Sequence, residues 1–323
     1  MNVLVTVPFK EEHMERIRAA AGEGATVTQL PVKPNSPDQS ALREALADAE
    51  VVIGEPKLRL LMTPDLPLKW IQMTWAGTDI YTASGAPFPE GVMLTNVAGK
   101  AYGHIISQYV VGQILALTQN LFDYARQQPT EKWRDLGPNI SLEGAHVLVF
   151  GAGDIGQHVA KRLQGFDIAK IVGVCRDTEK PRPYFDELIT LTTAEMRLPE
   201  FDVVVCCMPR ADSTIRYLNE RRLMRMKEGA VLVNVGRGNF IDCDALYRVL
   251  GTGRLRGAAL DVTDPEPLPL HHPLWRHPQC IITPHISGGA FGHSEGTEER
   301  ICQICCANLE HYRRGEPLEH RVL

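Results

Sequence analysis

The sequence predicts an α/β protein built from two doubly wound parallel-sheet domains. The chain has 323 residues, which is enough for about two domains of ordinary size. Strand-like and helix-like segments alternate in the first hundred residues, and a second such series begins near residue 146. This alternation is typical of βαβ units, in which neighbouring strands run parallel.

The composition is that of an ordinary globular chain, with 44% hydrophobic and 23% charged residues. A net charge of -5 shows no basic excess, so we expect no nucleic-acid partner. No apolar run approaches the roughly 18 residues that cross a bilayer, and the opening residues have no cationic targeting segment. We therefore expect a cytoplasmic protein with no membrane partner.

The first domain is predicted from alternating segments in chain order. Strand-like runs cover residues 2–7, 26–30, 51–54 and 69–74, and helix-like runs cover 11–22 and 40–50. Residues 101–127 then predict one long helix, because apolar residues recur at helical spacing throughout. A polar connector at 128–144 leads into the second series.

A glycine pattern, G-x-G-x-x-G, follows the first strand of the second series at Gly151, Gly153 and Gly156. Glycines in such a turn let the backbone approach a pyrophosphate, whose charge lies at the N-terminus of the next helix. The strand before the pattern and the amphipathic helix after it are the context that a dinucleotide site requires. We therefore predict a dinucleotide-binding loop here.

The end of the next strand bears on which dinucleotide is bound. An acidic residue for the ribose hydroxyls is expected about 20 positions after the glycines, and Cys175 stands there, followed by Arg176. Arginine suits a 2′-phosphate, which predicts NADP, with NAD also possible. The alternative is a register shift of two residues that makes Asp177 the ribose ligand.

Three later strand-like runs also end in polar residues. One stops before Arg237, the next at Asp261 with Glu266 beyond it, and the last before His285. Ligands of open parallel sheets bind beyond the carboxyl ends of the strands. An arginine, two carboxylates and a histidine are therefore expected at the same edge as the glycine loop.

The eight cysteines do not suggest a secreted disulfide framework. One cluster at 301–306, which contains Cys302, Cys305 and Cys306, has metal-like spacing, but only His311 lies near it in sequence. Zinc needs four ligands, so we favour core packing of a helix, keep zinc as the alternative, and predict no metal site.

Six blocks in this order resemble the D-isomer-specific 2-hydroxyacid dehydrogenases. They are TWAGTD, TNVAGKAYGHIISQYVVGQILAL, VFGAGDIGQ, VNVGRGNFID, ALDVTDPEPLP and TPHISG. The resemblance implies a flavodoxin-like substrate domain at 1–99 and 293–323, with a Rossmann dinucleotide-binding domain at 100–292 inserted between. It also implies a homodimer that acts on a small 2-oxo or 2-hydroxy acid.

The resemblance further implies a role for each candidate residue. His285 is the general acid/base, Glu266 its partner, and Arg237 the anchor of the substrate. The turn at Trp75, Ala76 and Gly77 binds substrate, its backbone amides holding the carboxylate. Asp261 holds the nicotinamide amide, and the implied cofactor contacts are Gly151, Gly153, Asp154, Ile155, Arg176, Met208, Pro209, Val235, Gly236, Asp261 and His285.

Two departures from the family pattern affect what can be carried over. Gln108 stands in the crossover helix where many members have glutamate, and Trp75 is bulky in a turn where smaller residues are common. Trp75 is expected to reshape the pocket, so glyoxylate, hydroxypyruvate and larger apolar 2-oxo acids all stay candidates. The alternative to an enzyme is a non-catalytic nucleotide sensor that resembles the C-terminal binding protein corepressors.

Overall fold

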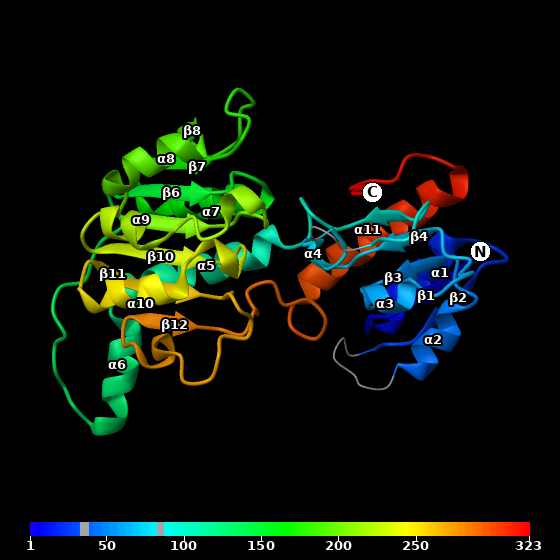
Figure 1. Ribbon diagram of the computed structural model, residues 1–323, viewed down its shortest axis with the longest axis horizontal. Helices are drawn as coiled ribbons and strands as arrows, with labels where there is room; N and C mark the ends of the chain where they lie inside the picture. Colours follow the sequence, from blue (N-terminus) through cyan, green and yellow to red (C-terminus); the bar gives the residue numbers. More distant parts are fainter. Residues whose placement is uncertain (33–38, 83–86) are drawn as a thin grey trace. The chain divides into compact units, whose positions relative to one another are not determined.

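The computed structural model describes residues 1–32, 39–82 and 87–323. These form two compact units, each with its own parallel sheet (Figure 1). Unit 1 comprises Met1–Tyr102 and Gly289–Leu323, and unit 2 comprises Gly103–Gly288. The predicted fold class of two parallel-sheet α/β domains is confirmed.

Unit 1 contains a five-stranded sheet within its described residues, in the order β2-β1-β3-β4-β5. This is the flavodoxin-like strand order. The strands are β1 (Asn2–Val5), β2 (Thr26–Gln29), β3 (Val51–Ile53), β4 (Trp70–Gln72) and β5 (Met93–Thr95). The helices are α1 (Glu11–Ala21), α2 (Ser40–Leu46), α3 (Leu58–Leu61), α4 (Asp79–Thr82) and α11 (Glu295–Arg314). Leu4, Val52, Ile71 and Leu94 bring four of the strands into one buried core.

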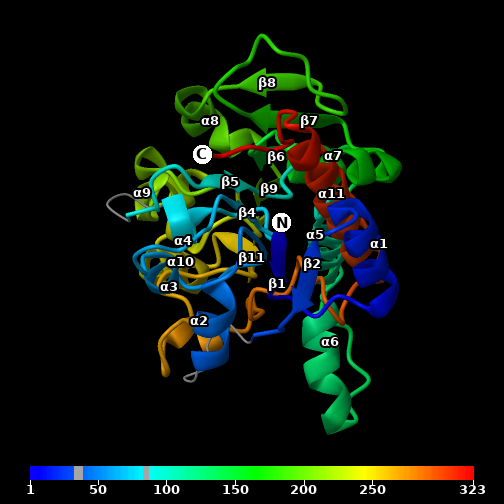
Figure 2. The ribbon, with the colours of Figure 1, turned by 90° about the vertical axis from the view of Figure 1, so that its right-hand side faces the viewer.

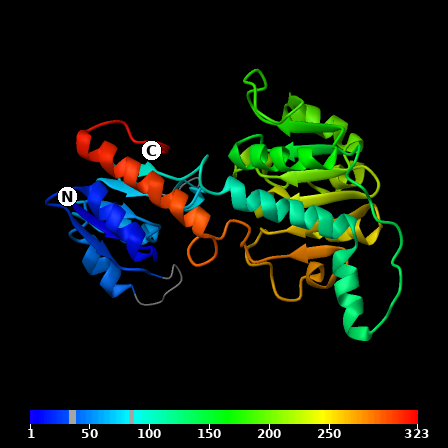
Figure 3. The same cartoon turned by 180° about the vertical axis from the view of Figure 1, so that it is seen from behind.

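The C-terminal helix α11 lies beside α1 in unit 1 (Figure 3). His13 of α1 is buried, with Nδ1 2.9 Å from Oε1 of Glu298 and Nε2 3.1 Å from Oε2 of Glu299. Cys302 and Cys305 face inward from α11 and are fully buried. Residues almost 300 positions apart in the chain are thus joined by both polar and apolar contacts.

Unit 2 contains a seven-stranded parallel sheet in the order β12-β11-β10-β9-β6-β7-β8, and all its residues are described. The strands are β6 (His146–Phe150), β7 (Lys170–Val174), β8 (Glu187–Ile189), β9 (Val203–Cys206), β10 (Ala230–Asn234), β11 (Leu255–Leu260) and β12 (Cys280–Ile282). The order reverses between β6 and β9, which is where ligands bind in a doubly wound sheet. The Rossmann order is therefore present, with one strand added at the edge.

Helices α5 (Gly103–Thr118), α6 (Leu121–Gln127), α7 (Asp154–Leu163), α8 (Leu191–Arg197), α9 (Glu220–Arg225) and α10 (Cys243–Gly251) complete unit 2. The single long helix predicted over 101–127 is wrong, because α5 ends at Thr118 and α6 begins at Leu121. Asn120 adopts a left-handed conformation with φ 56°. Arg256 donates hydrogen bonds to the carbonyls of Leu117 and Thr118 and to Oδ1 of Asn120, which satisfies the end of α5. Helix α6 then stands out from the body of unit 2 (Figure 2).

In the described parts of the chain, no helix is both long and apolar enough to cross a membrane. Nor do the described histidines, cysteines and acidic residues include a group of three that could hold a metal ion. All eight cysteines lie in the described ranges, and each is a free thiol.

Candidate active site and cofactor-binding loop

The glycine loop joins β6 to α7 at the point where the strand order reverses. Gly151 has φ 99°, a conformation that favours glycine, and a Cβ there would lie 3.0 Å from the carbonyl oxygen of Cys207. At Gly156 a Cβ would lie 2.1 Å from the carbonyl oxygen of Gly151. Both positions therefore accept only glycine while this tight turn is kept.

Gly153 differs from these two glycines, since a Cβ on it would meet no atom within 4 Å. It caps the N-terminus of α7, whose first residues are Asp154 and Ile155. An open backbone at a helix N-terminus offers N–H groups and positive dipole charge to an anion. The loop thus has the geometry that a pyrophosphate group requires.

The loop after β9 packs on this turn, and the loop after β10 packs on the loop after β9. A Cβ on Gly236 would lie 2.7 Å from the carbonyl oxygen of Met208, so the two backbones are in close contact. Pro209 is exposed next to Met208, whereas Val235 is buried beside Gly236. The structure therefore brings these four predicted cofactor contacts to the same sheet edge as the glycine loop.

At the end of β7, Arg176 is exposed and follows the partly buried Cys175. The Cys175 thiol donates to the carbonyl oxygen of Asp177 at 3.2 Å. Oδ1 of Asp177 accepts from the amides of Glu179 and Lys180, so this carboxylate stabilises a local turn. Arg176 is the exposed charged residue that directly follows Cys175 at this strand end.

His285 and Glu266 are in direct contact in unit 2. Nδ1 of His285 lies 2.7 Å from Oε1 of Glu266, and about half of each side chain is exposed. His285 follows β12 by three residues and has φ 54°, an uncommon conformation for a residue with a side chain. The imidazole is therefore held through Nδ1 and leaves Nε2 available to a ligand.

Asp261 holds the segment that carries His285. It is 1% exposed, and Oδ1 accepts from the hydroxyl of Thr283 at 2.6 Å and from the amide of Ile286 at 2.9 Å. Oδ2 accepts from the amide of Ser287 at 2.9 Å, and the Asp261 carbonyl accepts from the amide of His285. These bonds fix the backbone on both sides of the histidine.

Tyr109 of α5 extends this network. Its hydroxyl oxygen lies 2.6 Å from Oγ1 of Thr283. Because Thr283 gives its one proton to Asp261, Tyr109 must be the donor in this contact. Burial raises the pKa of Tyr109 to about 12, so the proton stays on the phenol at neutral pH.

Arg237 lies in the loop after β10, between two glycines. Nη1 donates to the carbonyl oxygen of Gly236 at 2.8 Å. Asn234 is fully buried at the end of β10, and it donates to the carbonyl of Arg237 while accepting from the amide of Gly236. A Cβ on Gly238 would lie 1.9 Å from the carbonyl oxygen of Thr263, so the loop passes close to the segment that leads to Glu266.

The predicted substrate turn, Trp75 to Gly77, belongs to unit 1 and follows β4. Asn96 donates to the carbonyl of Ala76 at 2.8 Å, and Tyr102 donates to the carbonyl of Thr74 at 2.8 Å. Within the described ranges, no hydrogen bond occupies the amides of Ala76 and Gly77. Both residues are partly exposed, so these two N–H groups can receive an anion.

Glu55 also holds this turn in place, although it was not among the residues predicted from the sequence. It follows β3, and Oε1 accepts from the amides of Thr74 at 2.6 Å and Trp75 at 3.0 Å. Burial raises the pKa of Glu55 to about 7, against the opposing effect of these hydrogen bonds. A carboxylate after a strand at the carboxyl edge of the sheet is the signal that could have revealed it.

Comparison with known proteins identifies the class of this fold. The model for the D-isomer specific 2-hydroxyacid dehydrogenase, NAD binding domain, matches residues 111–287. A glyoxylate reductase from Thermofilum pendens is 30% identical over 83% of this chain and 76% of its own length. An uncharacterized protein from Corynebacterium melassecola is 34% identical over 80% of this chain and 84% of its own length.

A crystal structure from Aeromonas salmonicida, described as a D-isomer specific 2-hydroxyacid dehydrogenase family protein, matches the whole fold. It is 31% identical, covers 100% of this chain and 98% of its own, and gives a TM-score of 0.86. The chain belongs to the D-isomer-specific 2-hydroxyacid dehydrogenase family. Its unit 2 is the NAD-binding domain of that family, and the family consists of oxidoreductases that act on 2-hydroxy acids.

Proposed function

We propose that this protein is a reductase of small 2-oxo acids that prefers NADP(H), with unit 1 as substrate domain and unit 2 as dinucleotide-binding domain. The observation that carries this proposal is the contact between His285 and Glu266 beyond the carboxyl ends of the unit 2 strands. The similarity to a glyoxylate reductase supports the reaction class. The bound dinucleotide would supply or accept the hydride.

His285 is the general acid/base in this proposal. Reduction of a 2-oxo acid places negative charge on the carbonyl oxygen, which a protonated imidazole within hydrogen-bond reach can neutralise. Glu266 accepts the Nδ1 proton, which orients the ring and leaves Nε2 to carry the transferable proton. The oxidation of a D-2-hydroxy acid uses the same groups in reverse.

Arg237 and the unit 1 turn bind the substrate in this proposal. A guanidinium is permanently charged and planar, so Arg237 can hold carboxylate and carbonyl oxygens together. The amides of Ala76 and Gly77 are assigned to the substrate carboxylate, with Trp75 beside them. These amides need no rearrangement to donate, because the turn is already fixed by Glu55 and Asn96.

Asp261 is assigned chiefly to positioning, because three of its acceptor sites are already used by Thr283, Ile286 and Ser287. A carboxylate has about four such sites. The contact with the nicotinamide amide that the family resemblance implies would use the remaining site on Oδ2. His285 would complete the nicotinamide side of the pocket.

The preference for NADP(H) is supported by the end of β7. Asp177 is engaged in its own turn, whereas the exposed Arg176 can pair with a 2′-phosphate. Asp154, Ile155, Met208, Pro209, Val235 and Gly236 are assigned to the rest of the dinucleotide. The eight free thiols support a cytoplasmic location, and we assign a homodimer to this enzyme as the family resemblance implies.

The experiment that tests this function is a panel of 2-oxo acids with each cofactor. Glyoxylate, pyruvate, hydroxypyruvate and 4-methyl-2-oxopentanoate are offered with NADPH or NADH, and oxidation of the reduced cofactor is followed at 340 nm. Turnover of at least one acid, with the D-isomer as product and a higher kcat/KM for NADPH, is expected. Failure to reduce any of them would refute the reductase, and a preference for NADH would refute the cofactor assignment.

A further inference from the structure

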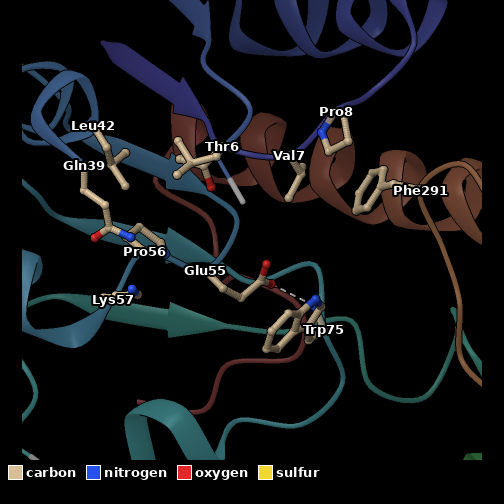
Figure 4. A pocket seen from close by; sticks show the side chains of 11 residues that line it. Thr6, Val7, Pro8, Gln39, Leu42, Glu55, Pro56, Lys57, Trp75 and Phe291 are labelled. Carbon is tan, nitrogen blue, oxygen red and sulfur yellow. Dashed lines mark hydrogen bonds between the residues drawn. The ribbon is translucent and has the colours of Figure 1, made fainter. Parts of the chain in front are cut away.

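Unit 1 contains a cavity of about 160 Å³ beside the turn that carries Trp75 (Figure 4). Apolar groups form most of its wall, and the charged residues among its lining are Glu55 and Lys57. An apolar cavity of about this volume holds a group the size of benzene. The lining residues most relevant here are Val7, Leu42, Pro56, Trp75 and Phe291.

The two carboxylate oxygens of Glu55 have different surroundings. Oε1 accepts both backbone amides, from Thr74 and Trp75. Among the residues that the structure describes, Oε2 has only the Thr74 hydroxyl as a partner, at 3.1 Å, and that hydroxyl also lies 3.0 Å from Oε1. Figure 4 shows one oxygen directed at the Trp75 amide and the other on the side of Val7 and Thr6. Oε2 is therefore the acceptor that the cavity presents to a ligand.

No cation among the described residues forms an ion pair with Glu55. The groups that face this carboxylate from neighbouring elements are the hydroxyls of Tyr81 and Tyr102 and the thiol of Cys305. Burial raises the pKa of each of these three groups, so all three are neutral between pH 6 and 8. Lys57 lines the same cavity. Lys57 forms no ion pair with Glu55, and no cation among the described residues lowers the pKa of Glu55.

We propose that this cavity receives the side chain of the substrate and that Glu55 is a specificity-determining residue that excludes a second carboxylate. The substrate class is then 2-oxo monocarboxylic acids with a neutral side chain. The inference rests on the proposed function, because the adjacent amides of Ala76 and Gly77 must hold the substrate carboxylate for its side chain to enter here. A like charge placed beside a desolvated carboxylate is strongly unfavourable.

The test compares two substrates of equal shape and different charge. Oxaloacetate and 4-methyl-2-oxopentanoate have side chains with the same number of heavy atoms and the same branching, but only the first is anionic. The kcat/KM for oxaloacetate is divided by the kcat/KM for 4-methyl-2-oxopentanoate, and this ratio is measured with NADPH in the unsubstituted enzyme and in Glu55→Gln. The glutamine oxygen can still accept from Thr74 and Trp75, so the turn is kept while the charge is removed.

In the unsubstituted enzyme the ratio should be below one, because the neutral acid is the better substrate. Glu55→Gln should raise the ratio at pH 8 by at least about tenfold. Because the pKa of Glu55 is about 7, the ratio in the unsubstituted enzyme should also rise, by up to about tenfold, as the pH falls from 8 to 6. Glu55→Gln should abolish this dependence. Proton transfer by His285 affects both substrates, so its pH dependence cancels in the ratio.

Lys57→Gln is the matched control, because it introduces the same residue into the same cavity. It removes an attractive charge and should leave the ratio equal or lower. Damage to the turn alone would lower kcat/KM for both acids equally in Glu55→Gln. An unchanged ratio, with 4-methyl-2-oxopentanoate still reduced, would overturn the role of Glu55 and leave the proposed function standing. Absence of turnover by the unsubstituted enzyme would instead overturn the proposed function, and this inference with it.

Discussion

Nδ1 of His285 lies 2.7 Å from Oε1 of Glu266, and the amide of His285 donates to the carbonyl of Asp261 at 2.9 Å. One acidic residue therefore orients the imidazole, and the other fixes the backbone that carries it. The buried Asp261 is in the better position to hold a fixed geometry, since it is 1% exposed while about half of the Glu266 side chain is exposed.

The first prediction concerns proton transfer. His285→Ala should lower kcat by about 10²- to 10⁴-fold, because the positioned acid is lost. Its dissociation constant for NADPH, measured by fluorescence titration, should stay within about twofold. Glu266→Gln should reduce turnover less, because the amide oxygen can still accept from Nδ1 of His285 while the carboxylate charge is lost. Unchanged kcat in His285→Ala would contradict the mechanism.

The second prediction concerns the chain of contacts from Tyr109 through Thr283 to Asp261. Tyr109→Phe should lower kcat about threefold to tenfold and the free energy of unfolding by about 1 kcal/mol, because Thr283 loses its donor. Thr283→Val removes both contacts and should lower kcat and the free energy of unfolding further. The double variant Tyr109→Phe/Thr283→Val should lose less free energy of unfolding than the two single variants together, since the residues share one network.

Tyr124→Phe is the control for this network. It deletes the same hydroxyl from α6, where the partners are Oδ1 of Asp135 and the amide of Leu136. Tyr124→Phe should leave kcat unchanged. Steady-state kinetics and urea unfolding measure both variants, and an equal loss of kcat in Tyr124→Phe would remove the positioning role from Tyr109.

The sequence predicted much of unit 2 because the chemistry lies where strands end. Arg237 and His285 each follow a strand by three residues, and parallel strands bring such positions to one edge. Tyr109 and Thr283 were missed because they are 174 positions apart and meet only through packing of α5. The break between α5 and α6 was missed for a similar reason, because Arg256 of β11 satisfies the end of α5. Local periodicity contains neither contact.

The third prediction concerns the cofactor. Arg176→Ala should raise the dissociation constant for NADPH about tenfold or more and leave that for NADH within about twofold, because only NADPH has a 2′-phosphate for the guanidinium. Isothermal titration with both dinucleotides measures this. Arg225→Ala, which removes an exposed arginine from α9, is the control and should change neither constant. Equal weakening of both dinucleotides by Arg176→Ala would remove the phosphate assignment.

The fourth prediction concerns substrate anchoring. Arg237→Ala should raise KM and lower kcat together, because the guanidinium binds the substrate and also stabilises the charge that develops during reduction. Arg237→Lys keeps a charge without the planar fork and should restore only part of the loss. A normal KM for the best 2-oxo acid in Arg237→Ala would show that Arg237 does not contact the substrate.

The fifth prediction follows from the burial of Glu55. Its pKa is raised to about 7 in the folded protein, well above the value near 4.5 of an ordinary glutamate. Folding therefore favours the protonated form, so the loss of stability begins as the pH rises above about 4.5 and is complete above about 7. Glutamine has no charge to bury and can keep the contacts to Thr74 and Trp75.

Glu55→Gln should therefore gain stability relative to the unsubstituted protein at pH 8, and this gain should shrink progressively towards pH 5. Urea unfolding monitored at several pH values measures the difference, and the same substitution at the exposed Glu90 is the control. A difference that is constant from pH 5 to 8 would mean that Glu55 is solvated in the folded protein, and the cavity would then lack the buried charge on which its selectivity depends.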